Sequence, residues 1–275
     1  MSGAKRSLSQ NFLVDPNLQR KIVDALEAEP GDLVVEVGPG HGELTRHLVG
    51  RVAHLLLVEK DDALAAELEA EWGSREDVTV LHADVLEADL EEAVDRCRRR
   101  AAAGRGAAPY RVISNVPYAI TSPLTFRILD LVPSPRRVVL TVQKEVGERM
   151  AADPGSKAYG SLSVGVQIRA RPEVAFGVSR HAFRPTPDVE SVTVVLEPRE
   201  DRPGREAEEA VRRLTRACFS RRRKQLQKIL RSAPEYGLEK SEARELCRSL
   251  GLDPRVRPEK VAPEVFLRLS RRLEE

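Results

Sequence analysis

Short apolar runs alternate with amphipathic segments over the first half of the chain. The runs at residues 33–37, 53–58, 78–81, 111–114 and 137–142 are rich in Val, Leu and Ile, as buried strands are. Between them, residues 17–28, 43–50, 62–72, 86–100 and 122–131 read as helices. This alternation predicts an α/β fold in which a mostly parallel sheet carries helices on both faces.

The second half of the chain has a different pattern. Residues 174–178 and 189–196 predict two strands separated by a proline-rich turn, which indicates an antiparallel edge. After a candidate linker at 198–205, residues 206–219, 222–232, 241–250 and 263–273 all read as helix. We therefore predict a catalytic domain at 1–200 and a small all-α domain at 201–275.

Charge separates the same two parts. The net charge is only +2, but residues 199–275 hold 21 Lys and Arg against 14 Asp and Glu. The remaining residues hold 24 against 29. A basic helical domain on a slightly acidic body suits nucleic-acid binding, and the alternative is a solvated helical surface.

Other bulk features narrow the class of protein. No apolar run approaches the roughly 20 residues of a membrane span, and the first ten residues lack the apolar core of a secretory signal. Three distant cysteines, Cys97, Cys218 and Cys247, suit a reducing cytoplasm better than a disulfide framework or a zinc site.

A glycine loop follows the first predicted strand of the sheet. Gly38, Gly40 and Gly42 would let the backbone turn sharply and approach a ligand closely. A dinucleotide fingerprint requires glycine at position 43, where this chain has Glu43, and no P-loop lysine follows. The G-x-G-x-G spacing after Glu36 is typical of enzymes that use S-adenosylmethionine.

Carboxylates end the next two predicted strands. Glu59 can accept hydrogen bonds from ribose hydroxyls, and Asp84, followed by Val85, can accept from the adenine amino group of a cofactor. In open α/β sheets, ligands bind at the carboxyl ends of the strands. We therefore predict a cofactor site formed by Gly38, Gly40, Glu59, Asp84 and Val85.

The sequence Asn115-Val116-Pro117-Tyr118 follows another predicted strand. The Asn115 side-chain oxygen and the Val116 carbonyl could accept both N–H bonds of an exocyclic amino group, while Tyr118 stacks on the ring. Methyl transfer from a sulfonium to such a nitrogen needs neither a metal nor a strong base. The alternative is an Asn-Pro turn with a half-buried tyrosine.

A target base must leave its duplex or be unpaired to enter such a clamp. Phe183, in a loop with two prolines, is either a second stacking surface or a core phenylalanine. The Arg/Ala/Gly run at 95–109 predicts a helix that becomes a mobile surface loop, which either contacts RNA or is a tolerated insertion.

Together these motifs resemble the rRNA adenine N6-dimethyltransferases, and within that family the small-subunit branch. The resemblance covers nearly the whole chain, through residues 9–13, 36–42, 59, 84, 115–118, 143–145, 152–160, 183–191, 219–224 and 250–259. The family more often has Leu at the position of Val116, and a shorter connection before Asn115.

The resemblance implies a Rossmann-like class I methyltransferase fold and S-adenosylmethionine contacts at Asn11, Leu13, Gly38, Glu59, Asp84 and Asn115. It also implies dimethylation of two adjacent adenines near the 3′ end of 16S rRNA, with the immature 30S subunit as partner. We expect a monomer without metal or membrane contact.

The basic run Arg221-Arg222-Arg223-Lys224 predicts salt-dependent RNA binding, and its alternative is a solvated helix start. Two rival functions stay open: a large-subunit resistance methyltransferase, and a ribosome assembly factor for which methylation is secondary. A small-molecule methyltransferase is disfavoured by the clamp and the basic tail.

Overall fold

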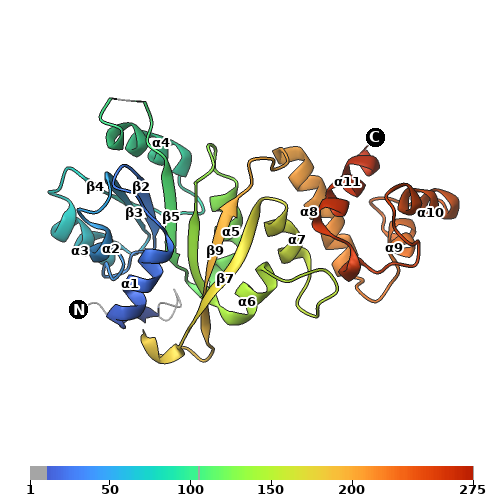
Figure 1. Cartoon of the computed structure of the whole chain (residues 1–275), viewed down its shortest axis with the longest axis horizontal. Helices are drawn as coiled ribbons and strands as arrows, with labels where there is room; N and C mark the ends of the chain where they lie inside the picture. Colours follow the sequence, from blue (N-terminus) through green and yellow to red (C-terminus); the bar gives the residue numbers. More distant parts are fainter. Residues whose placement is uncertain (1–10, 105, 275) are drawn as a thin grey trace. The chain divides into compact units, whose positions relative to one another are not determined.

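Two units, each with its own hydrophobic core, make up the protein in this computed structural model, which describes residues 11–104 and 106–274 (Figure 1). The first unit takes Met1–Gly147 and Pro172–Pro198, and the second takes Glu148–Arg171 and Arg199–Glu275.

A seven-stranded sheet is the centre of the first unit. Its order is β4 (Val78–His82), β3 (His54–Glu59), β2 (Leu33–Val37), β5 (Tyr110–Asn115), β6 (Val138–Gln143), β9 (Ser191–Pro198) and β7 (Ala170–Val178). Strands β4, β3, β2, β5 and β6 are parallel, and β9 pairs antiparallel with β6. The predicted parallel sheet and its antiparallel edge are therefore confirmed.

Side-chain alternation along these strands divides the core between the two faces of the sheet. Val34, Leu55 and Ile113 share one cluster with the helices α1 (Pro16–Ala25), α2 (Thr45–Leu48) and α3 (Asp62–Trp72). Neighbouring positions on each strand point to the opposite face. There α4 (Leu90–Ala101) packs on β3 and β2, and α5 (Thr121–Leu129) follows β5.

A two-stranded ribbon holds the described start of the chain beside this core. In it β1 (Phe12–Leu13) pairs antiparallel with β8 (Phe183–Arg184). Asp15 then caps α1 by accepting from the backbone N–H of Asn17 at 2.8 Å, and Pro16 occupies the first turn.

Helices form the second unit. They are α7 (Ser161–Gln167), α8 (Arg205–Phe219), α9 (Leu226–Ser232), α10 (Lys240–Ser249) and α11 (Pro263–Glu274). A buried ion pair joins its two chain segments, because Arg169 contacts Glu208 at 2.9 Å with both side chains 7% exposed. Among the described helices, none is long and apolar enough to cross a membrane.

Several segments differ from the sequence predictions. Helix α6 (Lys144–Met150) and α7 were not predicted, and Glu148–Arg171 groups with the C-terminal helices although it was expected in the first domain. The helix expected from residue 222 begins at Leu226, because residues 221–224 form a turn. Within the 95–109 run, α4 ends at Ala101, and residue 105 lies outside the described part.

Candidate active site

Four strands end at the same edge of the sheet. In the parallel register, Val37 on β2 lies beside both Val58 on β3 and Ser114 on β5, and Glu59 lies beside His82 on β4. The residues that end or follow these strands therefore converge, as the sequence predicted. They are Gly38, Glu59, Asp84 and Asn115.

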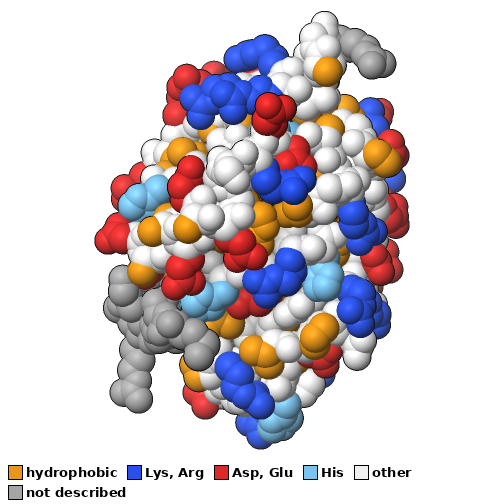
Figure 2. All heavy atoms as spheres, turned by 90° about the vertical axis from the view of Figure 1, so that its left-hand side faces the viewer, with side chains coloured by type: hydrophobic (Ala, Val, Ile, Leu, Met, Phe, Trp, Pro, Cys, Tyr) orange, Lys and Arg blue, Asp and Glu red, His pale blue; other side chains and the backbone are white. Residues whose placement is uncertain are grey.

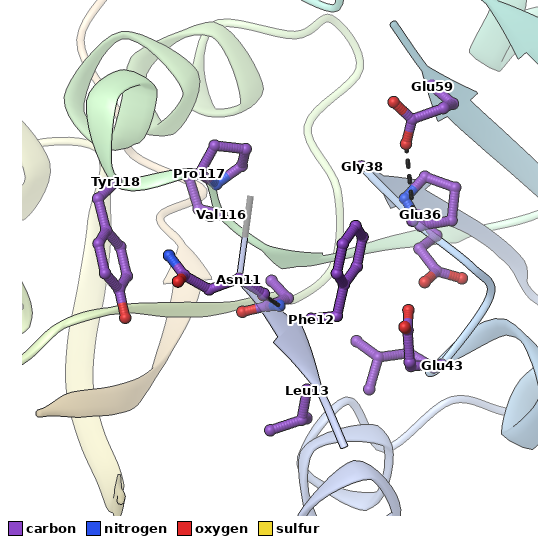
Figure 3. Close-up of a pocket in the computed structure, with 14 residues that line it drawn as sticks. Asn11, Phe12, Leu13, Glu36, Gly38, Glu43, Glu59, Val116, Pro117 and Tyr118 are labelled. Carbon is purple, nitrogen blue, oxygen red and sulfur yellow. Dashed lines mark hydrogen bonds between the residues drawn. The ribbon is translucent and has the colours of Figure 1, made fainter. Parts of the chain in front are cut away.

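One pocket brings together the glycine loop, the start of the chain and the predicted clamp (Figure 3). The ring of Phe12 stands between the clamp residues and the carboxylates of Glu36 and Glu43 (Figure 3). The lining residues are Asn11, Phe12, Leu13, Glu36, Gly38, Pro39, Gly40, Glu43, Leu44, Glu59, Asn115, Val116, Pro117 and Tyr118.

A second pocket lies next to the first, because Gly38, Glu59 and Pro117 line both. Its other lining residues include the predicted pair Asp84 and Val85, together with Val37, Val58, Lys60, Ala83, Leu86, Ala119 and Ile120. All predicted cofactor residues therefore lie around these two adjoining pockets. Ser9 and Gln10, from the motif at residues 9–13, lie outside the described residues.

The glycines of the loop have different surroundings. Gly38 has φ +65°, and a Cβ added there would meet no atom within 4 Å, so its backbone is open to close approach. Gly42 has φ +77°, and a Cβ there would lie 2.1 Å from the Trp72 ring. Gly38 thus suits ligand contact, whereas Gly42 allows the loop to pack on α3.

Glu59 is fixed by backbone donors at the mouth of the pockets. Its Oε1 accepts from the N–H groups of Lys60 and Asp61, each at 2.9 Å, and its Oε2 accepts from Gly40 at 3.3 Å. Burial raises the pKa of Glu59 above its ordinary value, while these hydrogen bonds oppose the rise. The carboxylate is therefore held in one orientation toward the glycine loop.

Asp84 is held in a similar way in the second pocket. The Lys60 ammonium contacts its Oδ2 at 2.6 Å, and the Leu86 N–H donates to its Oδ1 at 2.9 Å. The hydrogen bond from Lys60 holds the pKa of Asp84 below its ordinary value, so this side chain is a carboxylate at neutral pH.

Glu36 is a buried acid beneath the first pocket. Its side chain is 1% exposed, and its Oε2 accepts from the Thr45 hydroxyl at 2.6 Å. Burial, with Glu43 and Glu59 nearby, raises its pKa to about 8. At neutral pH Glu36 is therefore mostly protonated, and a cationic group in the pocket would favour the ionised forms of Glu36, Glu43 and Glu59.

Hydrogen bonds position the clamp. The Asn115 amide donates from Nδ2 to the Asn11 carbonyl at 3.0 Å, which leaves Oδ1 of the same amide as its acceptor. The Val116 N–H donates to the Thr141 carbonyl on β6 at 3.1 Å. Both residues are thus anchored to separate parts of the first unit.

Tyr118 begins a short 3-10 helix (Tyr118–Ile120) after the clamp proline. Its hydroxyl and that of Ser191 lie 2.7 Å apart. Burial, with Glu190 nearby, raises the pKa of Tyr118 above its ordinary value, so the side chain is neutral at physiological pH. The ring is therefore suited to stacking, and the hydroxyl is not a base.

Phe183 lies in the core. Its side chain is 1% exposed in the cluster with Leu13 and Ile22, and it lines neither pocket. Phe183 pairs with Leu13 through β8 and β1, so its visible role is to hold the start of the chain at the pocket. Of the two roles considered for Phe183, the structure therefore shows the core phenylalanine and not the stacking surface.

The predicted RNA-binding run lies in the second unit. Arg221, Arg222, Arg223 and Lys224 form the turn between α8 and α9, and not a helix start. By contrast, the face of the molecule in Figure 2, on the side of α3 and β4, interleaves Lys and Arg with Asp and Glu.

Sequence reasoning missed several lining residues. Phe12 lies within the motif at residues 9–13, and Lys60 directly follows Glu59. Glu36 was used to interpret the glycine spacing but was not predicted to line the site. Adjacency in sequence was their only signal. Among the described residues, no group of three or more His, Cys, Asp or Glu side chains could hold a metal ion.

A sequence model of the family "Ribosomal RNA adenine dimethylase" matches residues 1–275. The chain is 42% identical over 270 residues to ribosomal RNA small subunit methyltransferase A of Nitratidesulfovibrio vulgaris, covering 97% of this chain and 95% of that protein. The Moorella thermoacetica protein of the same name is 41% identical over 273 residues, covering 98% and 92%.

Solved structures show the same relationship. A dimethyladenosine transferase from Plasmodium falciparum has a TM-score of 0.77 at 25% identity, covering 94% of this chain and 95% of that one. The 23S rRNA methyltransferase ErmE has a TM-score of 0.69 at 26% identity, covering 96% and 100%.

Proposed function

Since the chain belongs to the ribosomal RNA adenine dimethylase family and is a methyltransferase, we propose that it methylates small-subunit rRNA. Its targets are two adjacent adenines in the hairpin loop near the 3′ end of 16S rRNA, each dimethylated at N6. The observation that carries this proposal is the position of the clamp at Asn115–Tyr118, which shares one pocket with the glycine loop.

The methyl donor in this proposal is S-adenosylmethionine, which supplies a methyl group on a sulfonium cation. The residues present fit such a group. Gly38 leaves its backbone open to the pocket. A sulfonium cation there would favour the ionised forms of Glu36, Glu43 and Glu59, which would in turn stabilise the cation. Glu59 would accept from the ribose hydroxyls, and Asp84 in the adjoining pocket from the adenine amino group.

The clamp would act on the amino group of the target adenine. That nitrogen is a poor nucleophile because its lone pair is delocalised into the ring. Asn115 Oδ1 and the Val116 carbonyl would accept its two N–H bonds and favour a tetrahedral nitrogen. Tyr118 would stack on the base and hold it in line for attack. The proton of N6 becomes acidic as the bond to carbon forms, so no strong base is required.

RNA recognition in this proposal combines an unpaired base with phosphate contacts. Sequence-specific RNA recognition commonly uses loops whose bases can be splayed out. The turn at residues 221–224 offers four cations, in a unit that holds 25 Lys and Arg against 16 Asp and Glu. The catalytic role of the first unit and the RNA-binding role of the second form part of the proposal.

The choice of the small subunit rests on the relatives. Two proteins named as small-subunit methyltransferases are more than 40% identical over nearly the whole chain, whereas the 23S enzyme is 26% identical. The test is methyl transfer from labelled S-adenosylmethionine to undermethylated small subunits, with sites mapped by primer extension. Two adjacent stops near the 3′ end of 16S rRNA are expected, and stops only in large-subunit RNA would contradict the proposal.

A role in small-subunit biogenesis, in the cytoplasm and as a monomer, belongs to the same proposal. A Glu59→Ala variant that loses cofactor binding can be introduced into a strain that lacks the wild-type protein. Restored subunit maturation would indicate a binding role, and no restoration would indicate that catalysis is needed. Size-exclusion chromatography with light scattering checks the monomer.

A further inference from the structure

Three loops of the second unit carry exposed cations and contact one another. Lys157 lies in the loop before α7, Arg221–Lys224 form the turn before α9, and Arg257 and Lys260 lie in the loop before α11. These segments are far apart in sequence, so their contact is a result of folding.

Hydrogen bonds join the three loops. The Arg222 guanidinium donates to the Lys157 carbonyl at 3.0 Å. The Gly155 N–H donates to the Glu259 carbonyl at 2.5 Å, and the Leu226 N–H donates to the Val256 carbonyl at 2.8 Å. Each loop is therefore bonded to at least one of the others, through backbone groups and the Arg222 side chain. Arg221 and Arg222 are half-buried, and the other cations are exposed: Lys157, Arg223, Lys224, Arg257 and Lys260.

Aromatic packing beneath the loops fixes this arrangement. Tyr159 lies in the loop before α7, Phe219 ends α8 and Phe266 lies on α11. The ring of Phe219 contacts the other two rings, each with centroids 5.9 Å apart. The Tyr159 hydroxyl also donates to the Val261 carbonyl at 2.8 Å, inside the core. The loops are thus anchored on a common core and present one surface.

The charges on these loops are not compensated locally. Among the described residues, none of the seven cations at 157, 221–224, 257 and 260 forms an ion pair with an acidic side chain. The acidic residues of these loops are Asp153, Asp253 and Glu259, fewer than the cations. By comparison, Arg213 on α8 pairs with Glu274 at 2.6 Å. Uncompensated like charges held together favour a polyanion as the partner.

We propose that Lys157, Arg257 and Lys260 bind RNA backbone phosphates together with Arg221–Lys224, as one surface made by three loops. This inference rests on the proposed function and extends the RNA contact beyond the single basic run. Arginine binds phosphate through a planar pair of N–H groups and lysine as a point charge, so the surface recognises the backbone and not the base sequence.

The test compares two triple variants. One is Lys157→Gln/Arg257→Gln/Lys260→Gln. The matched control, Arg212→Gln/Lys240→Gln/Arg271→Gln, removes the same charge from exposed helix positions of the same unit. Binding to a labelled RNA hairpin from the 3′ end of 16S rRNA is measured between 50 and 200 mM salt.

Each lost phosphate contact reduces the magnitude of the negative slope of log affinity against log salt by about one. Between 50 and 200 mM salt, one unit of slope corresponds to roughly a three- to fourfold change in affinity. The magnitude of the slope is expected to fall by about three for the loop variant and to stay unchanged for the control. Equal slopes for the two variants would overturn the inference.

Further readouts separate the possible failures. Lys157→Arg keeps the charge and is expected to keep the slope, while circular dichroism compares the folding of all variants. If wild-type protein transfers no methyl group to undermethylated small subunits, the proposed function fails. If it does transfer, and only substitution of Arg221–Lys224 changes the slope, the three-loop surface alone fails.

Discussion

Alanine at Gly42 tests the packing of the glycine loop on α3. An added Cβ would lie 2.1 Å from the Trp72 ring, and φ is +77°. A left-handed conformation costs an alanine about 1–2 kcal/mol, and overpacking adds about 1–3 kcal/mol. We therefore expect Gly42→Ala to lower the free energy of unfolding by roughly 2–5 kcal/mol.

Two other glycines separate the backbone cost from the overpacking cost. Gly50 has φ +74° and Gly38 has φ +65°, and an added Cβ would meet no atom within 4 Å at either. Gly50→Ala and Gly38→Ala should each cost only the backbone term of about 1–2 kcal/mol. Of these variants, only Gly38→Ala should weaken S-adenosylmethionine binding, because the alanine side chain would crowd the bound cofactor. An overpacking cost of about 1–3 kcal/mol corresponds to a loss of about 5- to 150-fold in affinity.

Urea unfolding followed by tryptophan fluorescence measures the stability, because Trp72 is the single tryptophan and contacts the loop. Titration calorimetry measures cofactor affinity. If Gly42→Ala is no less stable than Gly50→Ala, the ring moves aside and the packing argument is wrong. If Gly38→Ala binds the cofactor normally, the backbone of Gly38 is not a close contact.

Three further predictions concern single side chains at the pockets. Because burial raises the folded-state pKa of Glu36 to about 8 from 4.5, wild-type stability falls between these pH values by up to about 1.4 kcal/mol per pH unit. Glu36→Gln has no such titration, so its free energy of unfolding relative to wild type should rise from pH 6 to pH 8, as measured by urea unfolding. The same difference between variant and wild type at both pH values would contradict the raised pKa. Tyr118→Phe keeps the ring and loses only the contact with Ser191, whereas Tyr118→Ala also loses the stacking, which is worth roughly 1–3 kcal/mol. The methyl-transfer rate should therefore fall far less in Tyr118→Phe than in Tyr118→Ala. Equal losses of rate in the two variants would exclude stacking. Lys60→Met frees Asp84 and should weaken cofactor binding about two- to fivefold in calorimetry, with unchanged affinity refuting a positioning role.

The sheet could be predicted because its strands are short apolar runs bounded by turn residues. Residues 33–37 and 62–72 were predicted with the same bounds that β2 and α3 have. The residues that end or follow the strands were equally visible, since parallel strands bring Gly38, Glu59, Asp84 and Asn115 to one edge.

Features that depend on tertiary contacts could not be predicted. Strands β1 and β8 have two residues each, and local sequence does not distinguish a buried Phe183 from an exposed one. The segment of α7 contains β-branched residues and gave no helical pattern, yet it packs on α8, where the Ser161 hydroxyl donates to the Thr215 carbonyl at 3.3 Å. That packing assigns the segment to the second unit.

The proposed chemistry depends most directly on the acceptors at Asn115. The decisive measurement is single-turnover methyl transfer to undermethylated small subunits at saturating S-adenosylmethionine, with wild type and Asn115→Ala compared site by site. Wild type should dimethylate both adjacent adenines, and the variant should lose about 10²–10³-fold in rate, as enzymes do when one positioned hydrogen-bonding group is removed. A variant that methylates both adenines at the wild-type rate would contradict the account.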